Sequence, residues 1–136
     1  MQRITLFALL LAMLAACNKS NNTTDTPIST PEGALYKGTF RRLGTGNEVI
    51  SAVSLAFTGN GWTGTSQIQK YPALCNGTYR GNEQELVFDN GCAWTAEFDW
   101  TLILSGSYRL SADGDSLVLS KTYGAGYSDV YRLKRQ

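Results

Sequence analysis

The chain has 136 residues, of which 43% are apolar and 17% are charged, and it contains no histidine. The charged fraction lies below the usual value of about a quarter, which argues against disorder of the whole chain, and the length predicts one domain. Twelve basic residues against eleven acidic ones leave no basic field that would hold nucleic acid. The lack of histidine excludes Ser-His-Asp and Cys-His nucleophile systems and histidine-ligated zinc or copper.

Residues 1–16 predict a signal peptide. Arg3 precedes the apolar run Ile4–Ala16, which as a helix would span about 20 Å and is too short for a bilayer core of about 30 Å. The run ends at Leu14-Ala15-Ala16-Cys17, which resembles the lipobox of bacterial lipoproteins, where the cysteine is lipidated and becomes the new N-terminus. An ordinary signal peptide followed by a chance cysteine is the alternative.

Lipidation at Cys17 implies attachment to a membrane. A diacylglyceryl group with a further acyl chain such as palmitate exceeds the two chains that stable anchoring needs. Removing Arg3 leaves eleven basic side chains against eleven acidic ones, so we expect the acyl chains rather than a basic patch to hold the protein. Asn18 follows the cysteine. By resemblance to the sorting rule of enteric bacteria, the lack of aspartate there favours the outer membrane, and we expect a periplasm-facing lipoprotein.

Residues 17–32 are predicted to be the lipidated cysteine and a flexible tether, and residues 33–136 the folded domain. The polar segment Asn18–Pro31 has one apolar residue, Ile28, and no periodicity, so it cannot bury itself. Its fourteen residues would give a root-mean-square reach of about 20 Å. That reach would lift the domain clear of the lipid head groups.

From Leu35 onward, apolar and polar residues alternate between Gly, Asn and Asp turn signals, which predicts short antiparallel strands. Eight or nine strands in about 100 residues predict an all-β fold, either an antiparallel up-and-down barrel or a sandwich. The expected strands carry Tyr36–Phe40, Val53–Phe57, Trp62–Gln69, Cys75–Arg80, Glu85–Asp89, Phe98–Leu104, Gly106–Leu110, Leu117–Leu119 and Tyr131–Leu133.

Twenty large side chains are expected to point inward, at about 1.5–3 kcal/mol for each one fully buried. An eight-stranded barrel either fills with side chains or keeps room for one small ligand, and so many bulky residues favour a filled interior or a small pocket. The expected inward set is Tyr36, Phe40, Val53, Leu55, Phe57, Trp62, Ile68, Tyr79, Leu86, Phe88, Phe98, Trp100, Leu102, Leu104, Tyr108, Leu110, Leu117, Leu119, Tyr131 and Leu133.

Cys75 and Cys92 remain once Cys17 is lipidated, and an even remainder in an oxidising compartment predicts a structural disulfide. Closing a loop of about 18 residues would contribute roughly 3 kcal/mol by chain-entropy reasoning. A redox pair is the alternative, but it usually has C-x-x-C spacing, which is absent here.

Several of these features together resemble the small lipocalin-like lipoproteins of bacteria. They are the lipobox, the polar tether, the opening Tyr36-x-Gly38-Thr39-Phe40, the many short strands and the closing Tyr131-x-Leu133-x-Arg135. The resemblance covers about Leu35–Arg135. It implies a lipocalin-like barrel and, by family analogy, binding of a small apolar ligand.

Glu97 and Asp99 would share one side of the expected strand, about 7 Å apart, within the range of an inverting glycosidase pair. However, Phe98, Trp100 and Leu102 would occupy the core face and turn both carboxylates to solvent. We therefore expect no catalytic residue and no enzymatic activity, and we expect Trp100 to be a core residue. The sequence predicts neither a metal site nor a cofactor.

Aromatic residues near strand ends or in loops are the remaining hint of function: Trp62, Tyr71, Trp94, Tyr123 and Tyr127. They would form a platform for a sugar, lipid or peptide at one mouth of the barrel, or else plug the barrel ends as part of the core. The leading interpretation is a non-enzymatic, lipid-anchored envelope protein that binds a small apolar molecule or an envelope partner. The alternative is a protein-binding, inhibitory or assembly module with a filled barrel, and an enzyme ranks third.

Overall fold

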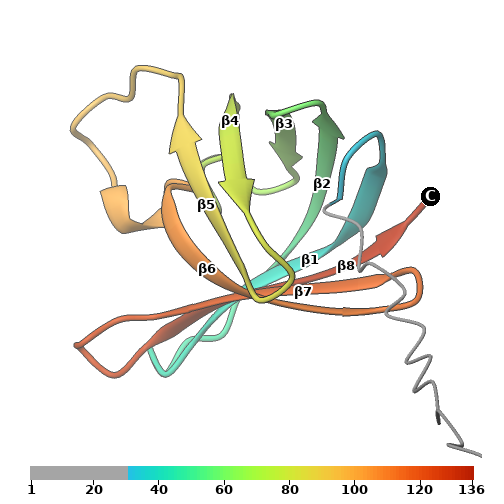
Figure 1. Cartoon of the computed structure of the whole chain (residues 1–136). Coiled ribbons are helices and arrows are strands. Elements are labelled where there is room, and N and C mark those ends of the chain that lie inside the picture. The colour runs from blue at the N-terminus through green and yellow to red at the C-terminus, as the bar shows by residue number, and fades with distance from the viewer. Residues whose placement is uncertain (1–30) are drawn as a thin grey trace, which may run out of the picture.

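The computed structural model describes residues 31–136, which form a closed barrel of eight antiparallel strands (Figure 1). Each strand pairs with the next, and β8 pairs with β1, so the predicted all-β class and up-and-down barrel are confirmed. The signal peptide, Cys17 and the tether lie outside the described residues. The strands are β1 (Leu35–Leu43), β2 (Ile50–Thr58), β3 (Gly61–Ser66), β4 (Asn76–Gly81), β5 (Glu85–Asn90), β6 (Gly106–Asp113), β7 (Ser116–Thr122) and β8 (Ser128–Arg135).

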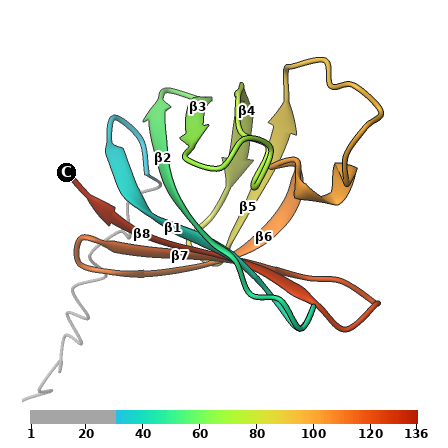
Figure 2. The same ribbon diagram turned by 180° about the vertical axis from the view of Figure 1, so that it is seen from behind.

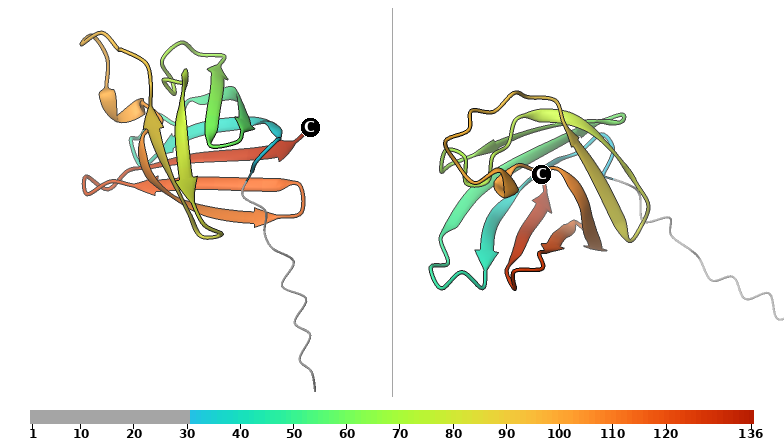
Figure 3. Two further views of the ribbon diagram at one scale, coloured as in Figure 1. Left: turned by 45° about the horizontal axis from the view of Figure 1, so that its top comes forward. Right: turned by 90° about the vertical axis from the view of Figure 1, so that its left-hand side faces the viewer.

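The two ends of the barrel differ in their connections. At one end lie the start of β1, the end of β8 and three turns of two or three residues (Figure 3). In two of these turns a glycine, Gly59 or Gly114, has φ = 55°, a left-handed conformation that suits glycine. The longer connections all gather at the other end, called here the loop end: residues 44–49, 67–75, 91–105 and 123–127. There, the β1–β2 and β7–β8 hairpins extend side by side (Figure 2).

Side chains fill the interior of the barrel. Sixteen of the twenty predicted inward residues are buried, and Leu55, Phe88 and Tyr131 have no exposed surface at all. Phe57 on β2 reaches across the interior, with its ring centre 5.0 Å from that of Tyr79 on β4 and 6.4 Å from that of Phe88 on β5. Residues with no surface open to a water-sized probe leave no room for a ligand beside them.

The strand predicted over Phe98–Leu104 is wrong. Residues 91–105 form the β5–β6 loop, which contains a single turn of 3₁₀ helix, η1 (Trp100–Leu102). The side chain of Asp99 caps this turn by accepting a hydrogen bond of 2.9 Å from the backbone nitrogen of Thr101. Such a local bond gives the backbone an alternative to strand pairing, and an alternating sequence alone does not reveal it.

Four predicted core residues are not in the core, three of them because of this loop. Trp100 is 56% exposed, and Phe98 and Leu102 are only partly buried, because their segment is a loop. Ile68 is 37% exposed because β3 ends at Ser66, short of the predicted end at Gln69.

No helix among residues 31–136 is long and apolar enough to cross a membrane.

The β3–β4 and β5–β6 loops are joined across the loop end. A disulfide links Cys75 to Cys92, with the Cα atoms 6.4 Å apart, which supports the predicted pairing. Close by, the Ala73 nitrogen donates to the Leu102 carbonyl at 3.0 Å, and the Leu104 nitrogen donates to the Ala73 carbonyl at 3.3 Å. The two loops therefore act as one covering layer over the barrel mouth.

Candidate functional site

An ion-pair network lies at the loop end, centred on Arg42. Arg42 and Asp129 are directly opposite each other on β1 and β8 and point into the barrel mouth, with side chains 6% and 1% exposed. Nε and Nη2 of Arg42 donate to the two carboxylate oxygens of Asp129 at 2.7 and 2.8 Å. Nη1 donates to Asp99 Oδ2 at 2.6 Å and to Thr101 Oγ1 at 3.0 Å. One guanidinium therefore links two strands of the barrel to the β5–β6 loop.

Two tyrosines of the β7–β8 loop cover this guanidinium. The rings of Tyr123 and Tyr127 stack with their centres 4.6 Å apart, and Arg42 Cζ lies 5.5 and 4.6 Å from those centres. The Tyr123 hydroxyl lies within hydrogen-bonding distance of Asp129 Oδ2, at 3.0 Å, and of the Thr101 carbonyl, at 2.9 Å. The guanidinium thus contacts two aromatic rings as well as two carboxylates.

The network stabilises its charged form. Burial alone would lower the pKa of Arg42, but the hydrogen bonds and charges of Asp129 and Asp99 outweigh it and raise that pKa. Burial likewise acts to raise the pKa of Asp99, yet hydrogen bonds from Thr101 and the charge of Arg42 lower it overall. Burial, together with the negative charge of Asp129, raises the pKa of the Tyr123 hydroxyl. Every guanidinium nitrogen already has an acceptor, so Arg42 has no unpaired nitrogen with which to bind a ligand. The role of this network is therefore structural: it holds the β5–β6 loop to the barrel.

The β5–β6 loop is attached to the barrel along its length. Besides the disulfide and the Arg42 bonds, Lys70 Nζ donates to Thr95 Oγ1 at 3.1 Å, and Lys121 Nζ donates to the Ser105 carbonyl at 2.8 Å. Burial lowers the pKa of Lys121, partly offset by the charge of Asp129. These bonds hold the loop in one conformation, so any surface that it forms is preorganised.

A cleft of about 590 Å³ lies where β5 extends beyond its pairing with β6. The last paired residues of that ladder are Phe88 and Gly106, and the β5–β6 loop spans the opening that follows. The rings of Trp94 and Phe98 pack edge to face, with their centres 5.6 Å apart. Trp100 Nε1 donates to the Thr95 carbonyl at 3.1 Å. The cleft is lined by Asp89, Asn90, Cys92, Ala93, Trp94, Trp100, Ile103 and Ser105.

The five aromatic residues predicted as a platform do not form one cluster. Trp62 is 2% exposed and belongs to the core, where its Nε1 donates to the Asp89 carbonyl at 3.3 Å. Tyr71 belongs to the β3–β4 loop, and its ring packs edge to face with that of Phe40, with the ring centres 5.2 Å apart. Trp94 lines the cleft, whereas Tyr123 and Tyr127 cover Arg42. Trp100, assigned to the core from the sequence, is the residue that joins Trp94 in the cleft.

Glu97 and Asp99 lie in the loop rather than on a strand, so the spacing argument for a glycosidase pair does not apply. Both residues are exposed, as predicted, and the Asp99 carboxylate is bound by Arg42. Among residues 31–136, no group of three or more Cys, Asp or Glu side chains is placed to hold a metal ion.

Sequence reasoning missed Arg42 and Asp129, although the signal was present. Inward positions on β1 recur at every second residue, from Tyr36 through Phe40, and the next is Arg42. On β8 the same count backwards from Tyr131 reaches Asp129. Residues of opposite charge at inward positions of two strands predict a buried ion pair, because neither charge is tolerated alone in the interior.

Comparison with known proteins adds one finding. Residues 1–18 match the family described as a prokaryotic membrane lipoprotein lipid attachment site, and this range includes Cys17. The match and the barrel together support a bacterial lipoprotein held in a membrane by lipid. No curated protein and no solved structure matches the chain.

Proposed function

We propose that this lipid-anchored envelope protein binds an envelope partner protein at its loop end, in the cleft lined by Trp94 and Trp100. The observation that carries the proposal is the filled interior of the barrel. Phe57, Phe88 and Tyr131 occupy the space in which a lipocalin-like barrel would hold a small apolar ligand. Binding therefore takes place on the outside of the barrel, and the alternative module with a filled barrel replaces the ligand carrier as the leading interpretation.

The cleft has the properties of a preorganised binding surface. Trp100 is one of the few large apolar side chains that are mainly exposed among the described residues. Large amphipathic aromatic rings are enriched at the centres of protein interfaces, where they bury much area at low entropic cost. The disulfide and the Arg42 network hold the loop that carries Trp94 and Trp100, so little conformational freedom is lost on binding.

The same proposal includes the absence of enzymatic activity and placement at the outer membrane, facing the periplasm. Asp99 is held by Arg42, and Glu97 is exposed in the same loop, so neither carboxylate has the buried setting that supports acid–base catalysis. The outer-membrane placement rests on Asn18 following the lipidation site.

Site-specific crosslinking in the native envelope tests this function. A photoreactive amino acid at Ala93, which is exposed and lines the cleft, should yield a discrete crosslinked protein. The same group at Thr78, exposed on β4, should not. Trp100→Ala should abolish the crosslink at position 93 while the protein stays folded and membrane-bound. Equal crosslinking from positions 93 and 78, or a crosslink at 93 that survives Trp100→Ala, would contradict a partner site in this cleft.

A small apolar ligand remains the second candidate, since Trp94, Trp100 and Ile103 line the cleft. Titration of the purified protein with a fluorescent fatty acid separates the two functions. We expect no saturable binding. Saturable one-to-one binding that is lost in Trp94→Ala would instead assign the cleft to a small ligand.

A further inference from the structure

The outer face of β1 and β8 is positively charged, although the chain as a whole is nearly neutral. Lys37 and Arg41 on β1 and Arg132 and Lys134 on β8 alternate with the inward residues of their strands and so point outward. These four residues are called here the basic face. Lys37 and Lys134 are direct cross-strand neighbours, and Arg132 lies opposite Thr39. β1 and β8 lie next to each other along one side of the barrel (Figure 1).

The charges of the basic face are not balanced by nearby acids. Like charges directly opposite each other on neighbouring strands destabilise a sheet, as for Lys37 and Lys134. Within residues 31–136, none of the four cations forms an ion pair. The outward positions of β7, β8, β1 and β2 hold no Asp or Glu. The nearest acids by register lie in the connections: Asp115 precedes Ser116, the neighbour of Lys134, and Glu48 lies two positions before Ile50, the neighbour of Arg41. The four cations are therefore free to attract an external anion.

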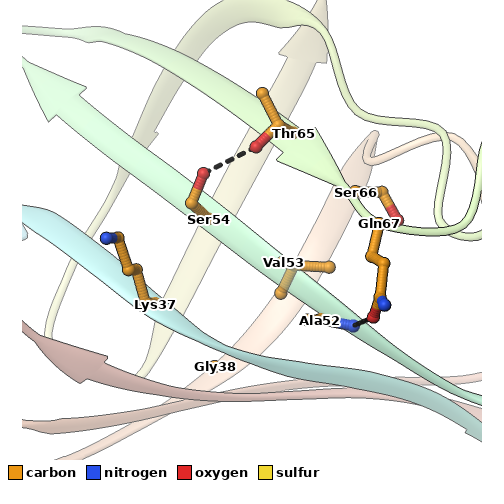
Figure 4. A pocket seen from close by; sticks show the side chains of 8 residues that line it. All are labelled: Lys37, Gly38, Ala52, Val53, Ser54, Thr65, Ser66 and Gln67. Atoms are coloured by element: carbon orange, nitrogen blue, oxygen red, sulfur yellow. Dashed lines mark hydrogen bonds between the residues drawn. The ribbon is translucent and has the colours of Figure 1, made fainter.

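Hydroxyl groups lie beside the basic face. A shallow depression of about 350 Å³ lies on the outside of β1, β2 and β3. Its lining side chains include Lys37 on β1, Ser54 on β2 and Thr65 on β3 (Figure 4). The hydroxyls of Ser54 and Thr65 are hydrogen-bonded to each other at 2.8 Å. A lysine ammonium beside hydroxyl donors is a combination that binds phosphate oxygens.

Two exposed apolar residues lie on the same side. Leu35 points outward on β1 and is 41% exposed, and Ile50 points outward on β2 and is 51% exposed. Ile50 is the cross-strand neighbour of Arg41. Cations that alternate with exposed apolar side chains suit the boundary between lipid head groups and acyl chains.

We propose that the basic face docks on the anionic phospholipid head groups of the membrane that holds the lipid anchor. This inference rests on the lipoprotein match and goes beyond the proposed partner binding. β1 carries half of the face and begins at Leu35, eighteen positions after Cys17. That length of chain spans at most about 60 Å, so the anchor confines the domain near the bilayer, and a tether long enough to hold the domain clear of the head groups also lets the basic face reach them. The cleft lies at β5, four strands from β1 and three from β8 around the eight-stranded barrel, and therefore stays accessible when β1 and β8 face the lipid.

Fluorescence of the lipidated mature protein in vesicles tests the docking. An environment-sensitive dye is placed at Thr39→Cys, between Lys37 and Arg41, or at Thr78→Cys on β4 as a control. In vesicles with about 30% phosphatidylglycerol, the dye at position 39 should shift to the blue and be quenched by head-group quenchers, and about 0.5 M NaCl should reverse this. Pure phosphatidylcholine should give no shift at position 39, and neither vesicle should give one at position 78.

Matched charge variants show whether the basic face is responsible. Lys37→Gln/Lys134→Gln and Arg80→Gln/Arg109→Gln each remove two positive charges, but only the first pair lies on the basic face, since Arg80 and Arg109 are exposed on β4 and β6. Each basic residue near an anionic leaflet contributes about a fivefold change in occupancy, so the first variant should reduce docking about thirtyfold and the second should leave it unchanged.

Three results would overturn the proposal. One is an equal shift at positions 39 and 78. Another is a shift at position 39 that persists in phosphatidylcholine or in high salt. The third is an equal shift on phosphatidylcholine vesicles when soluble polyaspartate is added, which would assign the basic face to an acidic protein.

Discussion

Replacing Arg42 is the most direct test of how the loop end is held. Arg42→Met keeps a long apolar side chain and removes all four hydrogen bonds of the guanidinium, two of them to Asp129. Asp129 would then remain as a carboxylate that is 1% exposed, with only the Tyr123 hydroxyl left as a side-chain donor. Removing one partner of a buried pair costs more than the pair contributed, because the other charge is left uncompensated.

The two carboxylates bound to Arg42 should contribute very different amounts. For the buried partner Asp129, we expect Arg42→Met to lower the free energy of unfolding by about 3–5 kcal/mol. The Asp99 side chain is 50% exposed, so Asp99→Asn should cost no more than about 1 kcal/mol. Replacing both buried partners, in Arg42→Met/Asp129→Leu, should recover most of the loss because no charge is left in the barrel mouth.

Urea unfolding of these variants, followed by circular dichroism, measures the differences. A double-mutant cycle gives the coupling energy of Arg42 with Asp129 and, separately, with Asp99. The reasoning is refuted if Arg42→Met unfolds within about 1 kcal/mol of the unaltered protein, or if the coupling to Asp99 equals the coupling to Asp129. The first result would mean that the Asp129 carboxylate does not depend on Arg42 for compensation, and the second that burial does not distinguish the two ion pairs.

Three further predictions concern the core, alkaline pH and the anchor. Trp62→Ala should lower the free energy of unfolding by about 3–5 kcal/mol because Trp62 is buried, whereas Trp100→Ala should lower it by only about 0.5 kcal/mol because Trp100 is 56% exposed. Equal losses in urea unfolding would contradict the loop placement of Trp100. Burial raises the pKa of Tyr108 and Tyr131, so the stability that their neutral hydroxyls contribute is complete below pH about 10 and should be lost as the pH rises further. Circular dichroism at increasing pH checks this, and an unchanged signal would argue against it. Cys17→Ser should release the protein from membranes or leave an unprocessed precursor, so recovery of a processed form from salt-washed membranes would count against lipidation.

The barrel was predictable because its strands follow the simplest sequence rule. On β1, β2 and β8 large apolar side chains recur at alternate positions, as Val53, Leu55 and Phe57 do on β2. Short Gly-containing turns such as Thr58–Gly61 and Asp113–Gly114 separate neighbouring strands. When one face of a strand is buried, a shift of one residue would expose the whole apolar set, so the pattern determines which side chains face the core. Sixteen correctly assigned inward residues follow from this constraint.

The β5–β6 loop shows where that rule fails. Phe98, Trp100, Leu102 and Leu104 alternate as a strand would, yet only Leu104 is fully buried. The conformation of this segment is set by contacts distant in sequence, namely the disulfide from Cys75, the backbone bonds to Ala73 and the Arg42 guanidinium. Local alternation contains no information about these partners, so the cleft and its second tryptophan were not predictable from it.

The charge distribution depends on closure of the barrel in the same way. Counted along the chain, basic and acidic residues nearly balance, at twelve against eleven, and on that basis a basic patch was not expected. Lys37 and Lys134 are separated by almost the whole folded domain, and only the pairing of β1 with β8 makes them neighbours. The same closure places β5, with the tryptophan cleft, four strands away from β1 in either direction around the barrel. A lipid-facing side and a partner-facing side can therefore coexist in a chain whose total charge indicates neither of them.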